Sequence, residues 1–123
     1  MRYAILVLML AGCSIHQSPK DIMAEGSPTT HKLTQAPEAA AYCMLRNVEN
    51  WERPSIEAPV IPSVRPMPPG YELIVMGHSL EPSTIFVAHV MPDKPGSVAT
   101  IWQTARPIVH GRDVMKAAML KGC

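Results

Sequence analysis

Three stretches in the second half of the chain have the hydrophobic pattern of β-strands. They are rich in β-branched and apolar residues, and Gly, Pro, Asp and Ser residues separate them. We expect strands at 71–76, 84–91 and 97–104, and the turn residues at 92–96 favour an antiparallel hairpin between the last two. The stretch 84–91 is apolar on both faces except at His89, which predicts the central strand of a sheet.

An alanine-rich stretch at 35–48 has the spacing of an amphipathic helix. Thr34 is the expected N-cap, and Pro37 falls in the first turn, where its missing amide hydrogen has no intrahelical partner to lose. Alanines and Cys43 recur at i, i+3 and i+4 spacing. Cys43 is therefore expected on the helix face that packs against the core.

A second helix is expected at 107–123. Met115, Met119 and Cys123 lie four residues apart, which puts them on one stripe of the helix, and Val114 is expected close to that stripe. Both helices would then lie on one face of the sheet, and each would turn one cysteine inward.

The connector at 54–70 carries six prolines, which remove backbone hydrogen-bond donors. It cannot form a central strand, and we expect an extended segment that covers the sheet edge, with a short edge strand at 60–65 as an alternative. The predicted fold is α+β in the order α-β-β-β-α. Its antiparallel sheet has three strands, or four with the edge strand, and both helices pack on one face.

The first thirteen residues have a different pattern. Arg2 precedes an uncharged apolar run of about eight residues at 3–10. A membrane-spanning helix needs about 20 apolar residues, so this run is typical of a signal peptide instead. The tetrapeptide LAGC at 10–13 follows, and it resembles the lipobox of bacterial lipoproteins. The resemblance implies cleavage before Cys13, a diacylglycerol on the Cys13 thiol and an acyl chain on its freed amine.

Several acyl chains on Cys13 would give stable membrane anchoring. Ser14 follows the cysteine, whereas an aspartate at this position resembles an inner-membrane retention signal in such lipoproteins. This favours the periplasmic face of the outer membrane over the inner membrane. Residues 1–12 are then the signal peptide, and 13–33, which show no sustained periodicity, a flexible tether. Residues 34–123 form one small domain.

The cysteine count adds a constraint on the domain. If Cys13 carries lipid, the other two cysteines, Cys43 and Cys123, allow one intramolecular pairing. In an oxidising envelope compartment such a pair is usually bonded, and this disulfide would close a loop of about 80 residues. Free thiols or an intermolecular bond are the alternative.

The composition excludes some classes of partner. A net charge of +1 and a pI near 7.8 give no basic excess for binding nucleic acid. The chain has one Phe and two Trp, so Trp51 and Trp102 are expected in the core.

No residue pattern points to a reaction. His78, His89 and His110 come from different expected elements, with no second ligand at zinc-site spacing, and His16 and His31 lie far apart in the tether. No nucleophile elbow or phosphate-binding glycine loop is present in the sequence. We therefore expect no catalytic residue, no metal and no cofactor.

The overall pattern resembles that of small proteobacterial lipoproteins of unassigned function, which carry an early alanine-rich helix with one cysteine and a terminal helix that ends in another. We expect a non-enzymatic, lipid-anchored accessory or structural subunit that binds a periplasmic or outer-membrane protein. The alternative is an inhibitor or immunity-type lipoprotein that blocks an envelope-active enzyme through a protruding loop at 77–83 or 92–96. An enzyme built on the domain histidines is a third interpretation.

Overall fold

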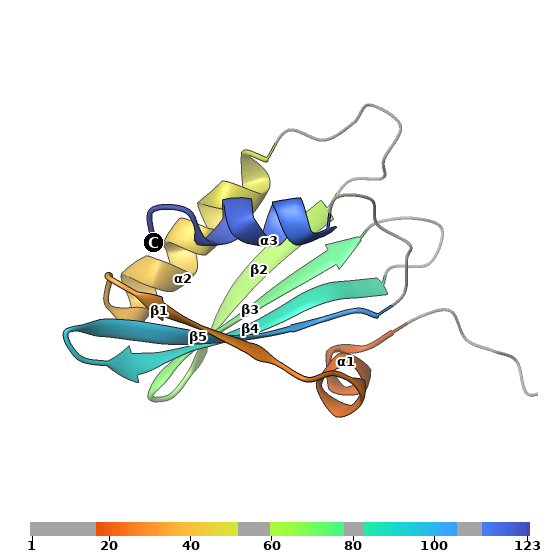
Figure 1. The fold of residues 1–123 in the computed structure, drawn as a ribbon, viewed down its shortest axis with the longest axis horizontal. Helices are drawn as coiled ribbons and strands as arrows, with labels where there is room; N and C mark the ends of the chain where they lie inside the picture. Colours follow the sequence, from red (N-terminus) through yellow and green to blue (C-terminus); the bar gives the residue numbers. More distant parts are fainter. Residues whose placement is uncertain (1–16, 52–59, 78–82, 106–111) are drawn as a thin grey trace, which may run out of the picture.

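The structure is a computed structural model that describes residues 17–51, 60–77, 83–105 and 112–123. Within these ranges it contains three helices and one five-stranded antiparallel sheet of order β1-β5-β4-β3-β2 (Figure 1). The elements are, in chain order, α1 (Pro19–Glu25), β1 (Thr29–Leu33), α2 (Pro37–Glu49), β2 (Val60–Met67), β3 (Gly70–Gly77), β4 (Ser83–Asp93), β5 (Gly96–Gln103) and α3 (Arg112–Leu120). None of the described helices is long and apolar enough to cross a bilayer.

The three expected strands are confirmed, but the predicted sheet of three or four strands in the order α-β-β-β-α is incomplete. The sheet has five strands, and α1 and β1 precede α2 in the described chain. The three expected strands correspond to β3, β4 and β5, and β4 occupies the centre of the sheet between the other two. The fourth strand, which the sequence left as an alternative, is present as β2 at one edge. Its residues Pro62 and Pro66 suit an edge position, because proline has no N–H to donate to a further strand.

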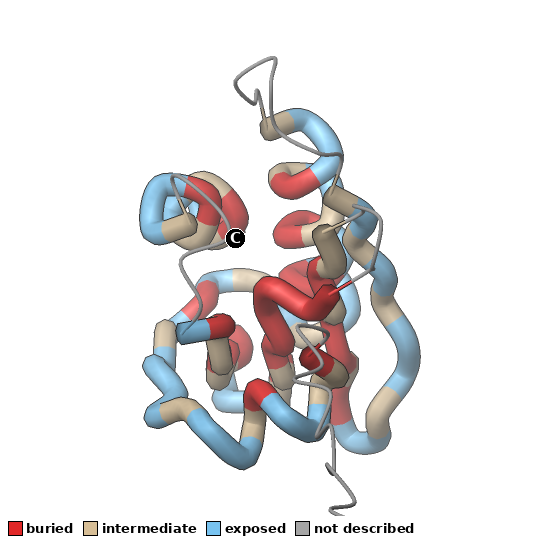
Figure 2. The backbone as a smooth tube through the Cα atoms, turned by 90° about the vertical axis from the view of Figure 1, so that its right-hand side faces the viewer, coloured by how far each residue is buried: buried red, intermediate tan, exposed pale blue. Residues whose placement is uncertain are grey.

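The expected placement of two helices on one sheet face is also confirmed. Figure 1 shows α2 and α3 together on the same side of the sheet. Their inward side chains meet those of the sheet in one core, and Figure 2 shows buried positions on the helices and on the strands beneath them. The largest side chains of this core that are fully buried are Met44, Val48, Leu73, Val75, Ile85, Phe86, Val90, Ile101, Met115 and Met119.

The end of the last predicted helix needs correction. The helix was expected at 107–123 and ends at Leu120, and 107–111 lie outside the described residues. Met115 and Met119 are fully buried as expected, but Val114 is 64% exposed, so its assignment near the inner stripe is wrong. At α3, a rotation of about 100° per residue carries the position before Met115 away from the core.

The N-cap of α2 also differs from the prediction. The helix begins at Pro37 with Ala36 as its N-cap, and no side chain caps it. The hydroxyl of Thr34 instead donates a hydrogen bond to the carbonyl oxygen of Cys123, 3.3 Å away. The side chain of Thr34 therefore binds the backbone of Cys123 and does not cap α2.

The disulfide between Cys43 and Cys123 is confirmed, with a Cα–Cα distance of 5.8 Å and a sequence separation of 80. It joins α2 to the residues that follow α3. The amide of Asn47, one turn after Cys43, donates hydrogen bonds to the carbonyl oxygens of Met119 and Lys121, both 2.9 Å away. Asn47 therefore satisfies carbonyl groups that the end of α3 leaves without intrahelical partners.

The segment predicted as a flexible tether contains two elements that the sequence analysis missed. Both α1 and β1 lie within 13–33, and 13–16 are outside the described residues. Ser18 and Asp21 form a capping box at the start of α1, in which each side chain accepts a hydrogen bond from the other residue's backbone N–H. The strand β1 pairs with β5 and completes the second edge of the sheet. Residues 17–33 therefore belong to the described fold, although the sequence assigns them to the tether.

A glycine at the start of β5 gives a test of how closely β1 is packed. A Cβ atom at Gly96 would lie 2.1 Å from the carbonyl oxygen of Leu33. We expect Gly96→Ala to lower the free energy of unfolding by about 1 to 3 kcal/mol, because the end of β1 must move away. Gly26→Ala is the control, since its Cβ would meet its nearest atom, the Ile22 carbonyl oxygen, at 3.3 Å. Equal losses in urea denaturation of the two variants would contradict this packing.

Candidate functional site

The sheet has a second face, opposite α2 and α3, which we call the open face. Side chains alternate along a strand, so the neighbours of the core residues point to this face. On β2 to β5 this face includes Ile61, Ser63, Arg65, Met67, Glu72, Ile74, Met76, Val87, His89, Met91, Val98, Thr100 and Trp102, and on β1 it includes Thr30 and Lys32. Only part of it is covered, because the short helix α1 lies on this side and contacts β4 and β5 (Figure 1). Ile22 of α1 is buried there, outside the main core.

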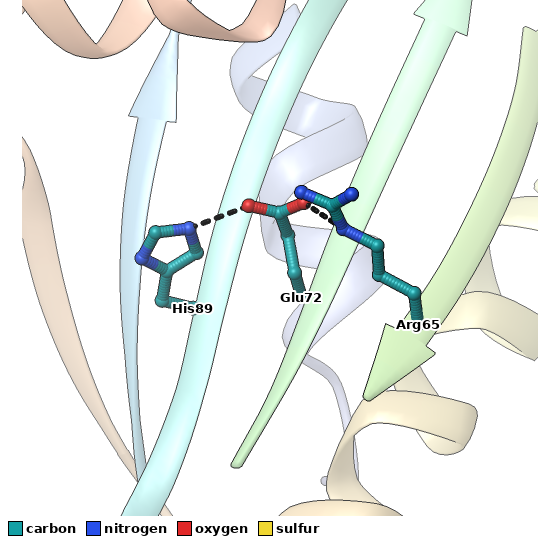
Figure 3. Close-up of polar contacts among 3 residues, drawn as sticks. All are labelled: Arg65, Glu72 and His89. Atoms are coloured by element: carbon teal, nitrogen blue, oxygen red, sulfur yellow. Dashed lines mark hydrogen bonds and ion pairs between the residues drawn. The ribbon is translucent and has the colours of Figure 1, made fainter. Parts of the chain in front are cut away.

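A polar cluster occupies the centre of the open face. Arg65, Glu72 and His89 lie directly opposite one another on β2, β3 and β4. Figure 3 shows the three side chains converging, with the Glu72 carboxylate in the middle. Arg65 Nε lies 2.6 Å from Glu72 Oε1, and His89 Nε2 lies 2.8 Å from Glu72 Oε2. The carboxylate is thus held from both sides.

The three members of the cluster differ sharply in exposure. The side chain of Glu72 is 4% exposed, that of His89 22% and that of Arg65 70%. An ionised carboxylate only accepts hydrogen bonds, so His89 Nε2–H and Arg65 Nε–H are the donors. The ring of His89 also meets that of Trp102 edge to face, with centroids 4.9 Å apart. The cluster therefore ends on one side in an exposed guanidinium and on the other in an aromatic ring.

This arrangement favours recognition over acid–base chemistry. The two oxygens of Glu72 bind Arg65 and His89, so the carboxylate fixes the positions of these two side chains. The guanidinium of Arg65 uses Nε for this contact, and its terminal nitrogens suit a carboxylate or carbonyl oxygen of a ligand. An arginine fixed by a buried acid is pre-organised, which reduces the entropy lost on binding.

A second polar group lies at one end of the sheet, around Gln17, which is 2% exposed. Its backbone N–H donates to Ser83 Oγ at 3.1 Å, and its carbonyl oxygen accepts from the N–H of Thr84 at 3.0 Å. The hydroxyl of Thr104 donates to its side-chain oxygen, and its side-chain amide donates to Glu25 Oε2 at 2.6 Å. These bonds fix the start of the folded chain where β4 begins and β5 has just ended.

Only some of the predicted site residues lie within the described part of the chain. Cys13, His16, His78 and His110 lie outside the described residues. The described ranges contain no group of three or more His, Cys, Asp or Glu residues that could hold a metal ion.

The two tryptophans have different positions. Trp51 packs against the core as expected. Trp102 was expected in the same core and lies instead half-buried on the open face, since Ile101 takes the inward position on β5.

The sequence did contain a signal for the polar cluster. Glu72 is the one charged residue in the strand predicted at 71–76, and His89 is the one polar residue in the apolar part of the strand that follows. Two isolated polar residues in neighbouring strands predict a cross-strand pair if the register brings them together. The sequence analysis groups His89 with His78 and His110 and assigns no role to Glu72 or Arg65.

The other described histidine, His31 on β1, gives a pH-dependent prediction. Burial and, to a smaller extent, the positive charge of Lys116 lower the pKa of His31 below its ordinary value of 6.5. The unfolded chain then binds the proton more readily, so this contribution to stability is complete above pH 6.5 and is lost as the pH falls towards the lowered value. In the His31→Gln variant, the free energy of unfolding measured by urea denaturation should change less between about pH 7.5 and about pH 5.5 than it does in the original protein. An unchanged pH dependence would contradict the assignment.

The comparisons with known proteins add no assignment to this geometry. Protein-family models, curated proteins and solved structures gave no match to the chain. The proposed function therefore rests on the residue pattern at 1–14 and on the contacts described above.

Proposed function

We propose that the protein is a non-enzymatic lipoprotein of the bacterial envelope, anchored through Cys13, that binds a periplasmic or outer-membrane protein as an accessory or structural subunit. The lipobox-like LAGC at 10–13 supports the anchor, and Ser14 favours the periplasmic face of the outer membrane. The Cys43–Cys123 disulfide is consistent with an oxidising compartment.

One observation carries the binding role, namely the exposed guanidinium of Arg65 held by the buried carboxylate of Glu72. Arginine and tryptophan are enriched among the residues that dominate protein–protein binding energy. The open face offers both, since Trp102 lies beside His89 at the other end of the cluster. Half-buried Met67 and Met91 are also on this face and add adaptable apolar surface.

Two features support a non-enzymatic role. The disulfide consumes both domain cysteines, so neither supplies a thiol nucleophile. The most buried carboxylate of the open face, Glu72, already accepts hydrogen bonds at both oxygens.

Arg65→Ala tests the proposal against a matched control, Arg46→Ala, which removes an exposed arginine from α2 on the other side of the sheet. Lipidated protein should retain a defined partner from detergent-solubilised envelopes, and this partner should be lost with Arg65→Ala but kept with Arg46→Ala. Melting curves would show that both variants are folded. Repeated failure to retain any partner, or equal loss with both variants, would count against the proposal.

The alternative, an inhibitor or immunity-type lipoprotein, places binding in a protruding loop. Residues 78–82 of one candidate loop lie outside the described residues. The other candidate, 92–96, joins β4 to β5, and Lys94 at its tip is exposed. Its Asp93 is paired with Lys32 at 3.0 Å. Loss of the partner with Lys94→Ala but not with Arg65→Ala would favour this alternative.

A further inference from the structure

We infer that the domain stands directly on the membrane surface, with the end of the sheet near Gln17 towards the bilayer and Ile61, Ile74 and Met76 in contact with lipid. We call these three residues the entry patch. This inference rests on the proposed lipid anchor at Cys13 and adds an orientation to it. It replaces the long tether that the sequence predicted with a short connection.

The first step is the reach of the chain between lipid and domain. Three residues separate Cys13 from Gln17 in the sequence. A polypeptide spans at most about 3.6 Å per residue, so the two Cα atoms lie within about 15 Å of each other. Gln17 itself is buried and fixed by hydrogen bonds to the sheet. A lipid on Cys13 would therefore hold this end of the sheet at the headgroup level.

The second step is the register, which places the entry patch at the same end. Gln17 bonds to the backbone of Thr84, Thr84 is paired with Met76, and Met76 is paired with Ile61. Neighbouring strands are about 4.8 Å apart, so Ile61 lies about 10 Å across the sheet from Thr84. Ile61 and Met76 therefore lie at the same end of the sheet as Gln17, and Ile74 lies two residues farther along β3.

The third step is the choice of face. The chain enters α1, which lies on the open-face side of the sheet, whereas α2 and α3 cover the other side (Figure 1). A helix with its side chains is about 10 to 12 Å thick. The outer surface of the α2 and α3 layer is therefore farther from Gln17 than the open face is.

The chemistry of the entry patch suits the interface of a bilayer. Ile61 is 50% exposed, and Ile74 and Met76 are half-buried. The neighbouring open-face position on β2 is the uncharged Ser63. Arg65 is four residues from Ile61, or about 13 Å along the strand, so the polar cluster would stay above the headgroups and accessible to a protein partner.

A matched pair of photocrosslinkers tests this orientation. Benzoylphenylalanine is introduced at Ile61 or at Val114, which is 64% exposed on α3. Each lipidated protein is reconstituted into vesicles of phosphatidylethanolamine and phosphatidylglycerol and irradiated, and lipid adducts are measured by mass spectrometry. We expect several-fold more adduct at Ile61 than at Val114. Both positions are exposed, so the fold should tolerate the substitution, which melting curves verify.

The outcomes separate this inference from the proposed anchor. Intact mass first shows whether Cys13 carries lipid, and its absence would overturn both. Lipid on Cys13 with equal or no adduct at Ile61 would overturn the orientation and leave the anchor standing. The same irradiation in cells should also give lipid adducts at Ile61. A discrete protein adduct there, without lipid adducts, would show that a partner protein covers the entry patch and would overturn the inference.

Discussion

Reduction of the Cys43–Cys123 disulfide is expected to lower the free energy of unfolding by about 4 kcal/mol. The bond closes a loop with a sequence separation of 80, so it removes many conformations from the unfolded chain. Reduction also removes a covalent link from the folded state, because the bond joins Cys123 to α2. For a domain of this size the melting temperature should fall by roughly 15 to 30 °C.

The measurement uses the Cys13→Ser protein, in which Cys43 and Cys123 are the remaining cysteines. Melting curves are recorded with and without a reducing agent, and the Cys43→Ala, Cys123→Ala double variant serves as the permanently reduced form. The reducing agent should have no effect on this double variant. A melting temperature of the Cys13→Ser protein that stays unchanged after complete reduction, verified by thiol counting, would contradict the expected contribution.

Replacing Arg65 and His89 together by leucine is expected to destabilise the fold by about 3 to 5 kcal/mol. The double variant keeps the Glu72 side chain, which is 4% exposed, and removes both groups that donate hydrogen bonds to it. A buried charge without a partner keeps its desolvation cost and loses the compensating contacts. The single variants should each cost less, because one donor remains. Urea denaturation of the original protein, the two single variants and the double variant gives the coupling free energy between Arg65 and His89.

A rescue variant separates this mechanism from a simple loss of packing. Adding Glu72→Met to the double variant removes the unpaired carboxylate, and an apolar side chain of similar length fills its place. Most of the lost stability should return. If the triple variant is no more stable than the double variant, the cost comes from the lost side-chain volume of Arg65 and His89 and not from the carboxylate.

The three strands β3, β4 and β5 could be predicted because each is buried enough to need a continuous apolar pattern. The same holds for the inner stripes of α2 and α3, whose spacing placed Cys43, Met115 and Met119 in the core. By contrast, β1 has the sequence TTHKL and buries only Leu33, so its strand pattern is too weak to recognise. Its pairing with β5 comes from backbone hydrogen bonds, which any sequence without proline can make.

The helix α1 was missed for a related reason. It is seven residues long and buries a single residue, Ile22, so no periodicity could develop. Its local signal was the capping box of Ser18 and Asp21, which a short helix needs because most of its backbone N–H groups lack intrahelical partners. What holds it is contact with β4 and β5, and this contact is between residues distant in the sequence.

The polar cluster shows the same division between local and long-range information. Glu72 and His89 could each be identified as an isolated polar residue in an apolar strand. That they meet, and that Arg65 completes the contact, depends on the pairing of β2 with β3 and of β3 with β4. A shift of one residue in either register would turn one partner to the opposite face of the sheet.

The sequence by itself determined the strands with continuous apolar patterns, the inner stripes of the two longer helices and the identity of the disulfide, because each depends on residues close together or on a unique count. It also contains the tetrapeptide LAGC at 10–13, on which the proposed anchor rests. Only the tertiary structure decided that the segment predicted as a tether belongs to the fold, that Arg65, Glu72 and His89 converge, and that Gln17 is buried at the same end of the sheet as Ile61. These features depend on register and on chain reversal, which bring together residues far apart in the sequence, and no local pattern encodes them.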